Sequence, residues 1–531
     1  MTDQNNWDSE SIGPEIAELN KLFTNRPLSS NKPRQTILIY SPRDWKSHVI
    51  WDLTIGLALK ERDCGVHVLT CGGGLPICLL GWGEENSQPC RRCANYTEKA
   101  NNAAQMDFSK LRDFLSEDDF TNTQKIVDAL KSHDDLFNFQ WNQMPISEIV
   151  KPSLIWIQRD GNIREDETTI NRHRDLILSA IRIGLYAERA MNSVKPDVVL
   201  LLNGVLFEER VIFEVAKSQN RRVIFYECGR DKNVLFFSHD NFACRYDLSE
   251  HWPKFKNQEL TKKEDTALQN WLDDREKGSG IRQDYWKDTP LLKDSDSIRK
   301  QFDIKKDEEV FVLFSNVTWD TAILDRASCF TSVFDWITET ILIFKETPDK
   351  KLIIRVHPAE TRVPGEEAKD NVISHLERTF TTLPQNVIVV GPDDPVSSYT
   401  LMNIAKAGIV YCSTIGLEMA SRGIPVITAA NADYADKGFT FDSSTKESYA
   451  QTLHDFFGNS GISEEHIKLA RQYAYLLIFR ASFLFDLVDA NDAHAPRLNF
   501  KTTSDLGEGK HPELDTICSG IISETPFLRE V

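Results

Sequence analysis

The stretch Ile409–Ile427, IVYCSTIGLEMASRGIPVI, contains a complete strand–helix–strand pattern. A short apolar run ends at Cys412, small polar residues follow, and a helical pattern then extends to Gly423. Pro425 opens a second apolar run. Continuous apolar runs of this length are typical of strands buried on both faces of a parallel sheet. The stretch therefore predicts a doubly wound α/β domain.

The same alternation continues on both sides of this stretch. In the C-terminal half, strands are predicted at residues 310–314 (VFVLF), 351–356 (KLIIRV) and 386–390 (NVIVV). In the N-terminal half, they are predicted at residues 36–40 (TILIY), 66–71 (VHVLTC), 198–202 (VVLLL) and 222–226 (RVIFY). A chain of 531 residues exceeds the roughly 250–300 residues that one core supports. We therefore expect two Rossmann-like doubly wound domains that face a central cleft.

Composition shifts along the chain set the expected domain boundaries. Residues 253–300 are charged and contain few aliphatic side chains, and residues 491–531 are polar. The prediction is an N-terminal leader (1–33), a first domain (34–255) with a Cys-rich loop (71–93) and a helical insertion, a linker (256–305), a second domain (306–490) and a loosely packed polar tail (491–531).

The charge balance and the hydropathy pattern exclude several classes of protein. Lys and Arg number 62 and Asp and Glu 80, for a formal net charge of −18. Such a surface disfavours nucleic acid and anionic lipid, so an anionic substrate requires a local positive site. No apolar run approaches the roughly 20 residues of a membrane span, and the N-terminal residues lack a signal-peptide pattern. We expect a cytoplasmic protein whose cysteines are reduced.

Polar residues follow the predicted strands of the second domain. Ser413 and Thr414 begin a helix whose N–H groups suit a phosphate, Gly416 permits close approach of a ligand, and Glu418 is placed to bind ribose hydroxyls. An ordinary capped helix is the alternative interpretation.

Two further strand ends extend this candidate donor-binding set. Pro358 fixes His357 at the tip of one strand, where it can contact a phosphate, and Arg355 ends the same strand. Ser315 and Asn316 end the strand before it. A surface histidine and an arginine on a sheet edge are the alternatives.

The first domain presents carboxylates at its predicted strand ends. Candidates for a catalytic base are Glu227, placed first, and Glu208 and Glu209. Glu208 and Glu209 also suit a helix start, where acidic side chains complement the dipole. The residues expected on the acceptor side are Arg43, Asn203 and Gly204. His239 is a further candidate.

Four cysteines, Cys71, Cys78, Cys90 and Cys93, crowd the segment CGGGLPICLLGWGEENSQPCRRC. Four thiolates suit a tetrahedral Zn²⁺ site or an iron–sulfur cluster, and the CRRC pair has metal-knuckle spacing. We expect a structural zinc ion, with a cluster or four unligated thiols as the alternatives, and no organic cofactor.

Together these motifs resemble the capsule-polysaccharide-biosynthesis family of GT-B glycosyltransferases, and they are similar to bacterial Kdo-transferases and sialyltransferases. The matching pieces are VVLLLNG with the following EER helix, FYECGR, VLFFSHDNFACRYDLSEHW, VLFSNVTWD, RVHPAE and YCSTIGLEMASRGIPVI. The resemblance extends from about Val198 to Asp442. It implies the GT-B fold for the two predicted domains.

The resemblance also implies residue roles and an activity. In these relatives the His-Pro pair and the Ser/Thr-rich segment hold the donor nucleotide, which implicates His357, Ser413, Thr414 and Glu418. Their base is a first-domain carboxylate. Glu227 precedes Cys228-Gly229, and Asp160-Gly161 is another possibility.

The implied function is transfer of a sugar from a nucleotide sugar to a glycan or lipid-linked acceptor in surface-polysaccharide assembly. The alternatives are a GT-B-fold sugar-nucleotide epimerase or hydrolase, and a non-catalytic subunit of an envelope polysaccharide complex. The partners implied are a nucleotide sugar and such an acceptor, with peripheral membrane association compatible with a lipid-linked one. No nucleic acid is expected.

Overall fold

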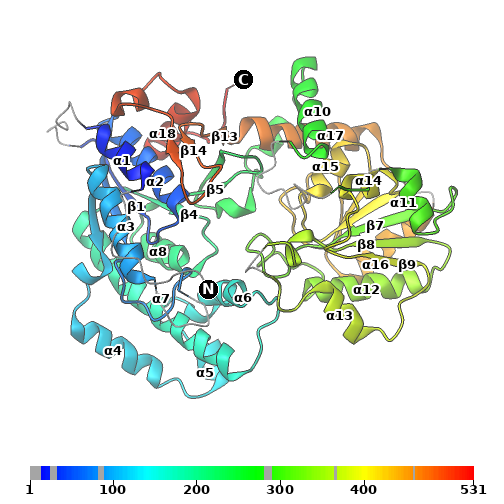
Figure 1. Cartoon of the computed structure of the whole chain (residues 1–531), viewed down its shortest axis with the longest axis horizontal. Helices are drawn as coiled ribbons and strands as arrows, with labels where there is room; N and C mark the ends of the chain where they lie inside the picture. Colours follow the sequence, from blue (N-terminus) through cyan, green and yellow to red (C-terminus); the bar gives the residue numbers. More distant parts are fainter. Residues whose placement is uncertain are drawn as a thin grey trace. The chain divides into compact units, whose positions relative to one another are not determined.

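The chain folds into two compact α/β units in a computed structural model (Figure 1). The structure describes residues 13–23, 33–81, 89–279, 290–292, 294–363, 367–458 and 461–530. Unit 1 comprises residues 1–157, 164–246 and 479–531, and unit 2 comprises residues 158–163 and 247–478. Each unit has a mainly parallel sheet with helices packed on it. The predicted α/β fold class, with two Rossmann-like doubly wound domains, is confirmed.

Unit 1 is built on a seven-stranded sheet of order β13-β6-β5-β4-β1-β2-β3. Its strands are β1 (Thr36–Tyr40), β2 (Gly65–Thr70), β3 (Asp107–Lys110), β4 (Val198–Leu202), β5 (Arg222–Cys228), β6 (Val234–His239) and β13 (Ser482–Leu484). Strands β1 to β5 are parallel to one another. Strand β6 pairs antiparallel with β5, and β13 pairs antiparallel with β6. The order reverses between β1 and β4, and ligands of doubly wound sheets bind outside the carboxyl ends of the strands at such a point.

Helices cover the sheet of unit 1 because its apolar strands need burial on both faces. They are α1 (Pro14–Lys21), α2 (Lys46–Lys60), α3 (Cys90–Ala103), α4 (Glu117–Asp128), α5 (His133–Phe137), α6 (Ile146–Gln158), α7 (Glu167–Val194), α8 (Phe207–Ser218) and α18 (Pro512–Ser523). A small hairpin, β14 (Val488–Asp489) with β15 (Arg497–Leu498), lies after β13.

Two expectations for unit 1 were wrong. The Cys-rich loop, predicted for residues 71–93, ends earlier, because helix α3 begins at Cys90. Within the predicted leader, residues 14–21 form the short helix α1, whose Ile16 and Leu19 are buried in the core of unit 1. Residues 491–531 are not a loose tail, because α18 packs on α2 and buries Leu514 and Ile517 in the same core. Figure 1 shows this C-terminal segment, in red, among the blue N-terminal elements.

Unit 2 is built on a six-stranded parallel sheet of order β12-β11-β10-β7-β8-β9. Its strands are β7 (Val310–Phe314), β8 (Lys351–Arg355), β9 (Val387–Val390), β10 (Ala407–Val410), β11 (Val426–Thr428) and β12 (Phe441–Asp442). The apolar run predicted at 310–314 is the fully buried β7. The strand order again reverses, between β7 and β10, which places a switch point beside the stretch that opened the sequence analysis.

The helices of unit 2 include segments that the sequence placed outside the second domain. They are α9 (Trp252–Phe255), α10 (Lys262–Glu276), α11 (Ser295–Gln301), α12 (Val333–Lys345), α13 (Val372–Thr379), α14 (Ser398–Asn403), α15 (Ile415–Ser421), α16 (Lys446–Phe457) and α17 (Glu464–Tyr475). The expected linker contains α10, which buries Leu268 and Leu272 and packs on α17. Its charged residues occupy the outer face of a short amphipathic helix, so this part of the chain is not a linker. The second unit also ends earlier than predicted, at residue 478.

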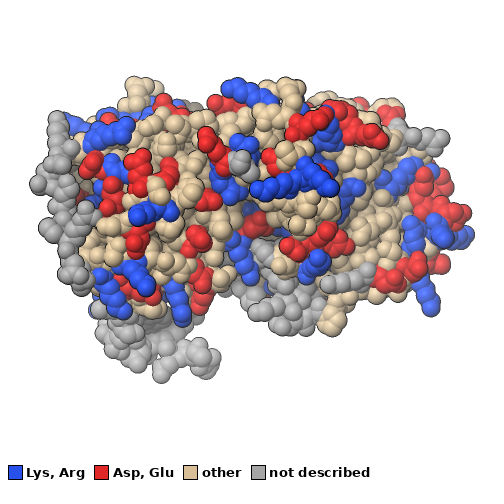
Figure 2. All heavy atoms as spheres, turned by 90° about the horizontal axis from the view of Figure 1, so that it is seen from above, with Lys and Arg blue, Asp and Glu red and all other residues tan. Residues whose placement is uncertain are grey.

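The surface agrees with the charge balance of the sequence. On the face shown in Figure 2, both acidic and basic side chains are distributed over the surface. Among the helices that the structure describes, none has the length and hydropathy to cross a membrane.

Candidate active site

The loop after β7 connects three strand ends of unit 2. Ser315 Oγ accepts a hydrogen bond from the backbone N–H of His357, with 2.9 Å between the two atoms. The side-chain oxygen of Asn316 lies 3.4 Å from the backbone nitrogen of Cys412, which donates to it. The ends of β8 and β10 are thus fastened to the end of β7 on either side. The polar residues predicted at these strand ends lie together at the switch point of the sheet.

His357 is held in one neutral form at this edge. Its Nδ1 accepts a hydrogen bond from the backbone N–H of Ala359 at 3.1 Å. Burial, assisted by the positive charge of Arg355, lowers the pKa of His357 to about 4. A neutral imidazole that accepts through Nδ1 carries its proton on Nε2. His357 is therefore set up as a hydrogen-bond donor at neutral pH, which suits a phosphate oxygen.

Arg355 stabilises the sheet edge. The side chain is 2% exposed, and Nη1 donates to the carbonyl oxygens of Gly391 at 2.6 Å and Asp394 at 3.3 Å. Burial lowers its pKa to about 10. These contacts tie the end of β8 to the loop after β9, so the structure gives this arginine a positioning role at the edge.

The segment after β10 differs from its predicted geometry. Thr414 is the N-cap of α15 and makes no side-chain capping bond, whereas Ser413 was expected to cap. The carbonyl of Ser413 instead accepts from the hydroxyl of Tyr434 at 2.5 Å. A Cβ atom at Gly416 would collide with this same hydroxyl. The glycine therefore makes room for Tyr434, and the expectation that it admits a ligand gains no support from the packing.

Both carboxylate oxygens of Glu418 accept hydrogen bonds from side chains of unit 2. Its Oε1 accepts from Arg275 Nε at 2.9 Å and its Oε2 accepts from the hydroxyl of Tyr399 at 2.8 Å. The residue is 2% exposed. Both oxygens are engaged by α10 and α14, so Glu418 joins these helices to α15. This arrangement contradicts the predicted contact with ribose hydroxyls.

Arg43, Glu208 and Glu209 form a buried charge cluster at the switch point of unit 1. Arg43 Nη1 donates to Glu208 at 2.5 Å, and Nη2 pairs with Glu209. Glu208 and Glu209 are 1% and 0% exposed. Burial raises the pKa of Glu209 to about 7 against the opposing effect of Arg43. A general base must reach the proton of its substrate. The two glutamates lack that access, so their placement as bases was wrong, and Arg43 is committed to them instead of an acceptor.

Glu227 keeps the geometry of a candidate base. It lies half-buried near the carboxyl end of β5. Asn203 Nδ2 donates to Glu227 Oε2 at 2.6 Å, and the backbone N–H of Cys228 donates to Oε1 at 2.7 Å. Asn203 has φ of 57°, a left-handed conformation that asparagine tolerates, and its own Oδ1 accepts from Val205 N–H at 2.9 Å. The carboxylate is therefore fixed by the end of the neighbouring strand.

Gly204 and His239 make packing contacts within unit 1. A Cβ at Gly204 would collide with Phe242 and Phe225, so the glycine is required by aromatic packing. His239, near the end of β6, contacts the carbonyl of Thr525 through Nε2 at 3.0 Å and stacks on Phe527. Its neighbours come from the C-terminal segment of unit 1. Neither position adds a group to the candidate site.

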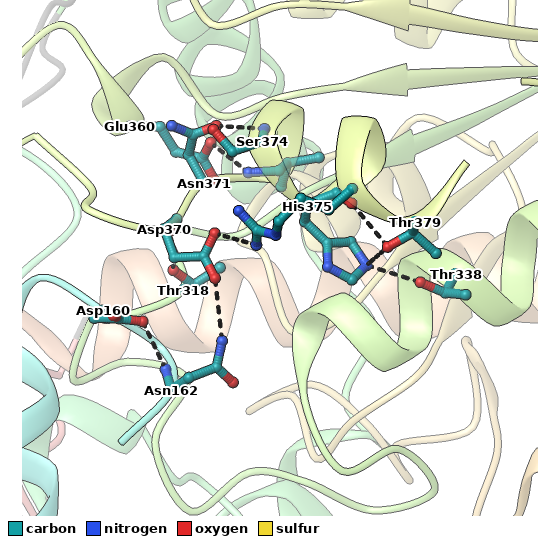
Figure 3. A network of polar contacts seen from close by, with 12 residues as sticks. Asp160, Asn162, Thr318, Thr338, Glu360, Asp370, Asn371, Ser374, His375 and Thr379 are labelled. Carbon is teal, nitrogen blue, oxygen red and sulfur yellow. Dashed lines mark hydrogen bonds and ion pairs between the residues drawn. The ribbon is translucent and has the colours of Figure 1, made fainter. Parts of the chain in front are cut away.

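Asp160 belongs to unit 2, although it is flanked by helices of unit 1. The chain leaves unit 1 after residue 157 and returns at residue 164. Asp160 is 2% exposed and its Oδ1 accepts from Asn162 N–H at 3.0 Å, which closes a tight turn. Asn162 Nδ2 then donates to Asp370 at 3.3 Å (Figure 3). Asp160 is therefore part of unit 2, whereas the base was expected in the first domain.

Glu360 is a residue of the RVHPAE motif to which the sequence gave no role. It is fully buried, and its Oε2 accepts from Val372 N–H at 3.1 Å, on the helix that also carries Ser374 and His375 (Figure 3). Its Oε1 is buried without a hydrogen-bond partner, and burial raises the pKa of Glu360 to about 8. The carboxyl group is thus neutral at pH 7. Its position three residues after His357 was the one available signal.

Comparison with known proteins identifies the matching part of the chain. Residues 246–457 match the family model of the capsule polysaccharide biosynthesis protein. This range contains every strand of the unit 2 sheet. The comparison with curated proteins gives no match.

The solved structures that match this chain have low sequence identity and low TM-scores. KpsC of Thermosulfurimonas dismutans, a β-Kdo 2,7-transferase, is 17% identical with a TM-score of 0.35, over 56% of this chain and 81% of that one. The β-Kdo 2,4-transferase KpsC of the same organism is 15% identical with a TM-score of 0.36, over 59% and 87%. A UDP-N-acetylglucosamine 2-epimerase of Listeria monocytogenes, described as putative, is 10% identical with a TM-score of 0.26, over 84% and 94%. The family model overlaps the motifs that lie in unit 2, and this part of the chain is similar to the capsule polysaccharide biosynthesis protein family.

Proposed function

We propose that this chain is a glycosyltransferase that moves a sugar from a nucleotide-sugar donor to a glycan or lipid-linked acceptor in capsule polysaccharide assembly. The observation that carries the proposal is the polar edge of unit 2, where Ser315, Asn316 and His357 are linked across the switch point. A nucleotide ligand is expected at such an edge of a doubly wound sheet. The family match over residues 246–457 supports the same assignment.

The donor is recognised, in this proposal, through neutral hydrogen-bond donors. The Nε2–H of His357 donates to a phosphate oxygen, since Nδ1 is occupied by Ala359. Hydroxyl and amide groups of Ser315, Asn316, Ser413 and Thr414 supply further hydrogen bonds around it. Neutral donors of this kind bind an anion while avoiding the desolvation of a buried charge.

Glu227 is our candidate for the base. As the acceptor hydroxyl attacks the anomeric carbon of the donor, its proton passes to the Glu227 carboxylate. The bond from the anomeric carbon to the phosphate oxygen breaks, and the nucleotide leaves with that electron pair. Asn203 positions the carboxylate through the 2.6 Å hydrogen bond. A carboxylate base of this kind contributes about 10²–10⁴-fold to rate.

A turnover assay with a panel of CMP-, UDP- and GDP-linked sugars tests the proposal. We expect release of nucleotide that depends on an added glycan or lipid-linked acceptor, together with a glycosylated product. Conversion of a donor into its epimer without acceptor would replace transfer by epimerisation, and acceptor-independent release of sugar would replace it by hydrolysis. No turnover with any donor would favour a non-catalytic role. The proposal includes a cytoplasmic location, where nucleotide-sugar donors are available, and peripheral contact with a membrane that carries the acceptor.

A further inference from the structure

Four cysteines of unit 1 line one small cavity. Cys71 follows β2, Cys78 lies in the next loop, and Cys90 and Cys93 are in the first turn of α3. All four border the same cavity of about 20 Å³. Its remaining lining is Pro42, Arg43, Gly73, Leu80, Pro89 and Glu208. Residues far apart in the sequence thus converge on a space that accommodates about one ion or water molecule.

The backbone around the cavity is shaped to bring these cysteines together. Gly72, Gly73 and Gly74 have φ values of 65°, 94° and 107°, a run that residues with side chains rarely adopt. A Cβ added at Gly73 would lie 3.6 Å from the Cβ of Cys90, so the loop passes directly beside the helix start. Cys90 and Cys93 are three residues apart on α3 and therefore share one face of the helix.

A backbone N–H group of the same loop is directed at one of these sulfurs. The N–H of Gly81 donates to Cys78 Sγ, with 3.3 Å between the two atoms. A donor of this kind also stabilises a sulfur that carries negative charge, as a metal-bound thiolate does.

We propose that Cys71, Cys78, Cys90 and Cys93 bind one Zn²⁺ ion in a closed, structural site. As the side chains stand, no three His, Cys, Asp or Glu residues of the described part of the chain form a metal-ligating set. Binding therefore requires the thiol groups to turn inward and replaces four S–H protons by four S–Zn bonds, with release of the protons. The small cavity favours a single ion over an iron–sulfur cluster.

Glu208 borders the cavity but is excluded as a ligand. Its Oε2 accepts from Arg43 at 2.5 Å and its Oε1 accepts from Leu79 N–H at 3.0 Å. Four thiolates then complete the tetrahedral sphere that zinc adopts in structural sites.

Metal analysis of the full chain purified without added metal tests this site. We expect about one equivalent of zinc, released by a thiol-specific mercurial, and a Co²⁺-substituted form with thiolate-to-cobalt charge-transfer absorption. Cys90→Ser and Cys93→Ser should each lower the zinc content severalfold. Cys329→Ser, which alters a half-buried cysteine of unit 2, is the matched control and should retain zinc.

Three results would overturn the zinc site. They are absence of stoichiometric metal in the unsubstituted chain, iron with visible cluster absorption, and zinc retained at full stoichiometry in both the Cys90 and Cys93 variants. The mercurial and cobalt measurements use the unsubstituted chain, so they decide the question even where a serine variant fails to fold.

Discussion

Asn203 donates a hydrogen bond from its side-chain amide to Glu227, with 2.6 Å between Nδ2 and Oε2. The bond joins the ends of β4 and β5 and holds a half-buried carboxylate at the edge of the unit 1 sheet. Among the three glutamates predicted as bases, Glu227 alone keeps this access, since Glu208 and Glu209 are buried against Arg43. The first two predictions concern this pair.

Glu227→Gln should abolish most sugar transfer and leave donor binding unchanged. Glutamine preserves the shape and removes proton acceptance, so we expect kcat to fall about 10²–10⁴-fold. Steady-state kinetics with the donor identified in the panel measures this. Glu188→Gln, an exposed glutamate on α7 of the same unit, should keep full activity. Wild-type rates in the Glu227 variant would remove this residue from the mechanism.

Asn203→Gly should lower the rate of transfer and leave nucleotide binding unchanged. Glycine accepts the left-handed backbone of this position, so the substitution removes the hydrogen bond to Glu227 without adding strain. The carboxylate then loses one of the groups that hold it in position, so kcat should fall while the Kd for the nucleotide product stays the same. Steady-state kinetics and isothermal titration measure the two quantities. Wild-type kcat in this variant would show that Asn203 does not position the base.

His357→Ala should weaken nucleotide binding. Loss of one hydrogen bond to a charged group costs about 1.5–3 kcal/mol, or roughly ten- to a hundredfold in Kd. Isothermal titration with the nucleotide product gives the change. His454→Ala, an exposed histidine on α16, is the control and should bind as the unsubstituted chain does. Equal affinities for all three proteins would contradict the placement of the donor at this edge.

Arg275→Met should destabilise unit 2. The guanidinium pairs with Glu418 at 2.9 Å, and removal of one partner leaves a buried carboxylate with one hydrogen bond. Breaking a buried pair costs about 3–5 kcal/mol. Urea unfolding measures the loss of unfolding free energy. This loss should be larger than that caused by Lys277→Met, which alters the exposed residue after the last turn of α10. A stable variant with weakened nucleotide binding would restore the ligand role predicted for Glu418.

Glu360 should make the stability of unit 2 depend on pH. Burial raises its pKa to about 8, above the ordinary 4.5, so the folded chain holds a proton that the unfolded chain releases. Its contribution is complete below about pH 4.5 and declines as pH rises through 8. Glu360→Gln, which mimics the protonated acid, should flatten this dependence in urea unfolding between pH 5 and pH 9. An identical slope in both proteins would show that Glu360 does not titrate with folding.

The sequence predicted the sheets well because their strands are continuous apolar runs. Strand β7 matches the predicted residues 310–314, and β1 matches 36–40. Helix α18 was missed because its core residues, including Leu514 and Ile517, are separated by polar positions in a polar segment. Strand β13 has three residues and forms only by pairing with β6. Such short elements depend on tertiary contacts that no local pattern contains.

The sequence predicted those residues of the candidate site that directly follow a strand. Ser315, Asn316 and His357 lie together because parallel strands present their carboxyl ends at one edge. The partner of Glu418 was not predictable, because Arg275 lies 143 residues away in a segment whose charge resembles that of a linker. The same holds for Arg43, which is separated from Glu208 by 165 residues. Charges that appear available in a sequence are here paired through long-range contacts.

A crystal structure of the chain with the nucleotide selected by the turnover panel tests the central claim most directly. The account predicts density for the nucleotide outside the carboxyl ends of β7 and β10, with a phosphate oxygen within hydrogen-bond distance of His357 Nε2 and near Ser315 and Ser413. A nucleotide bound at any other place on the chain, with His357 out of contact, would contradict it.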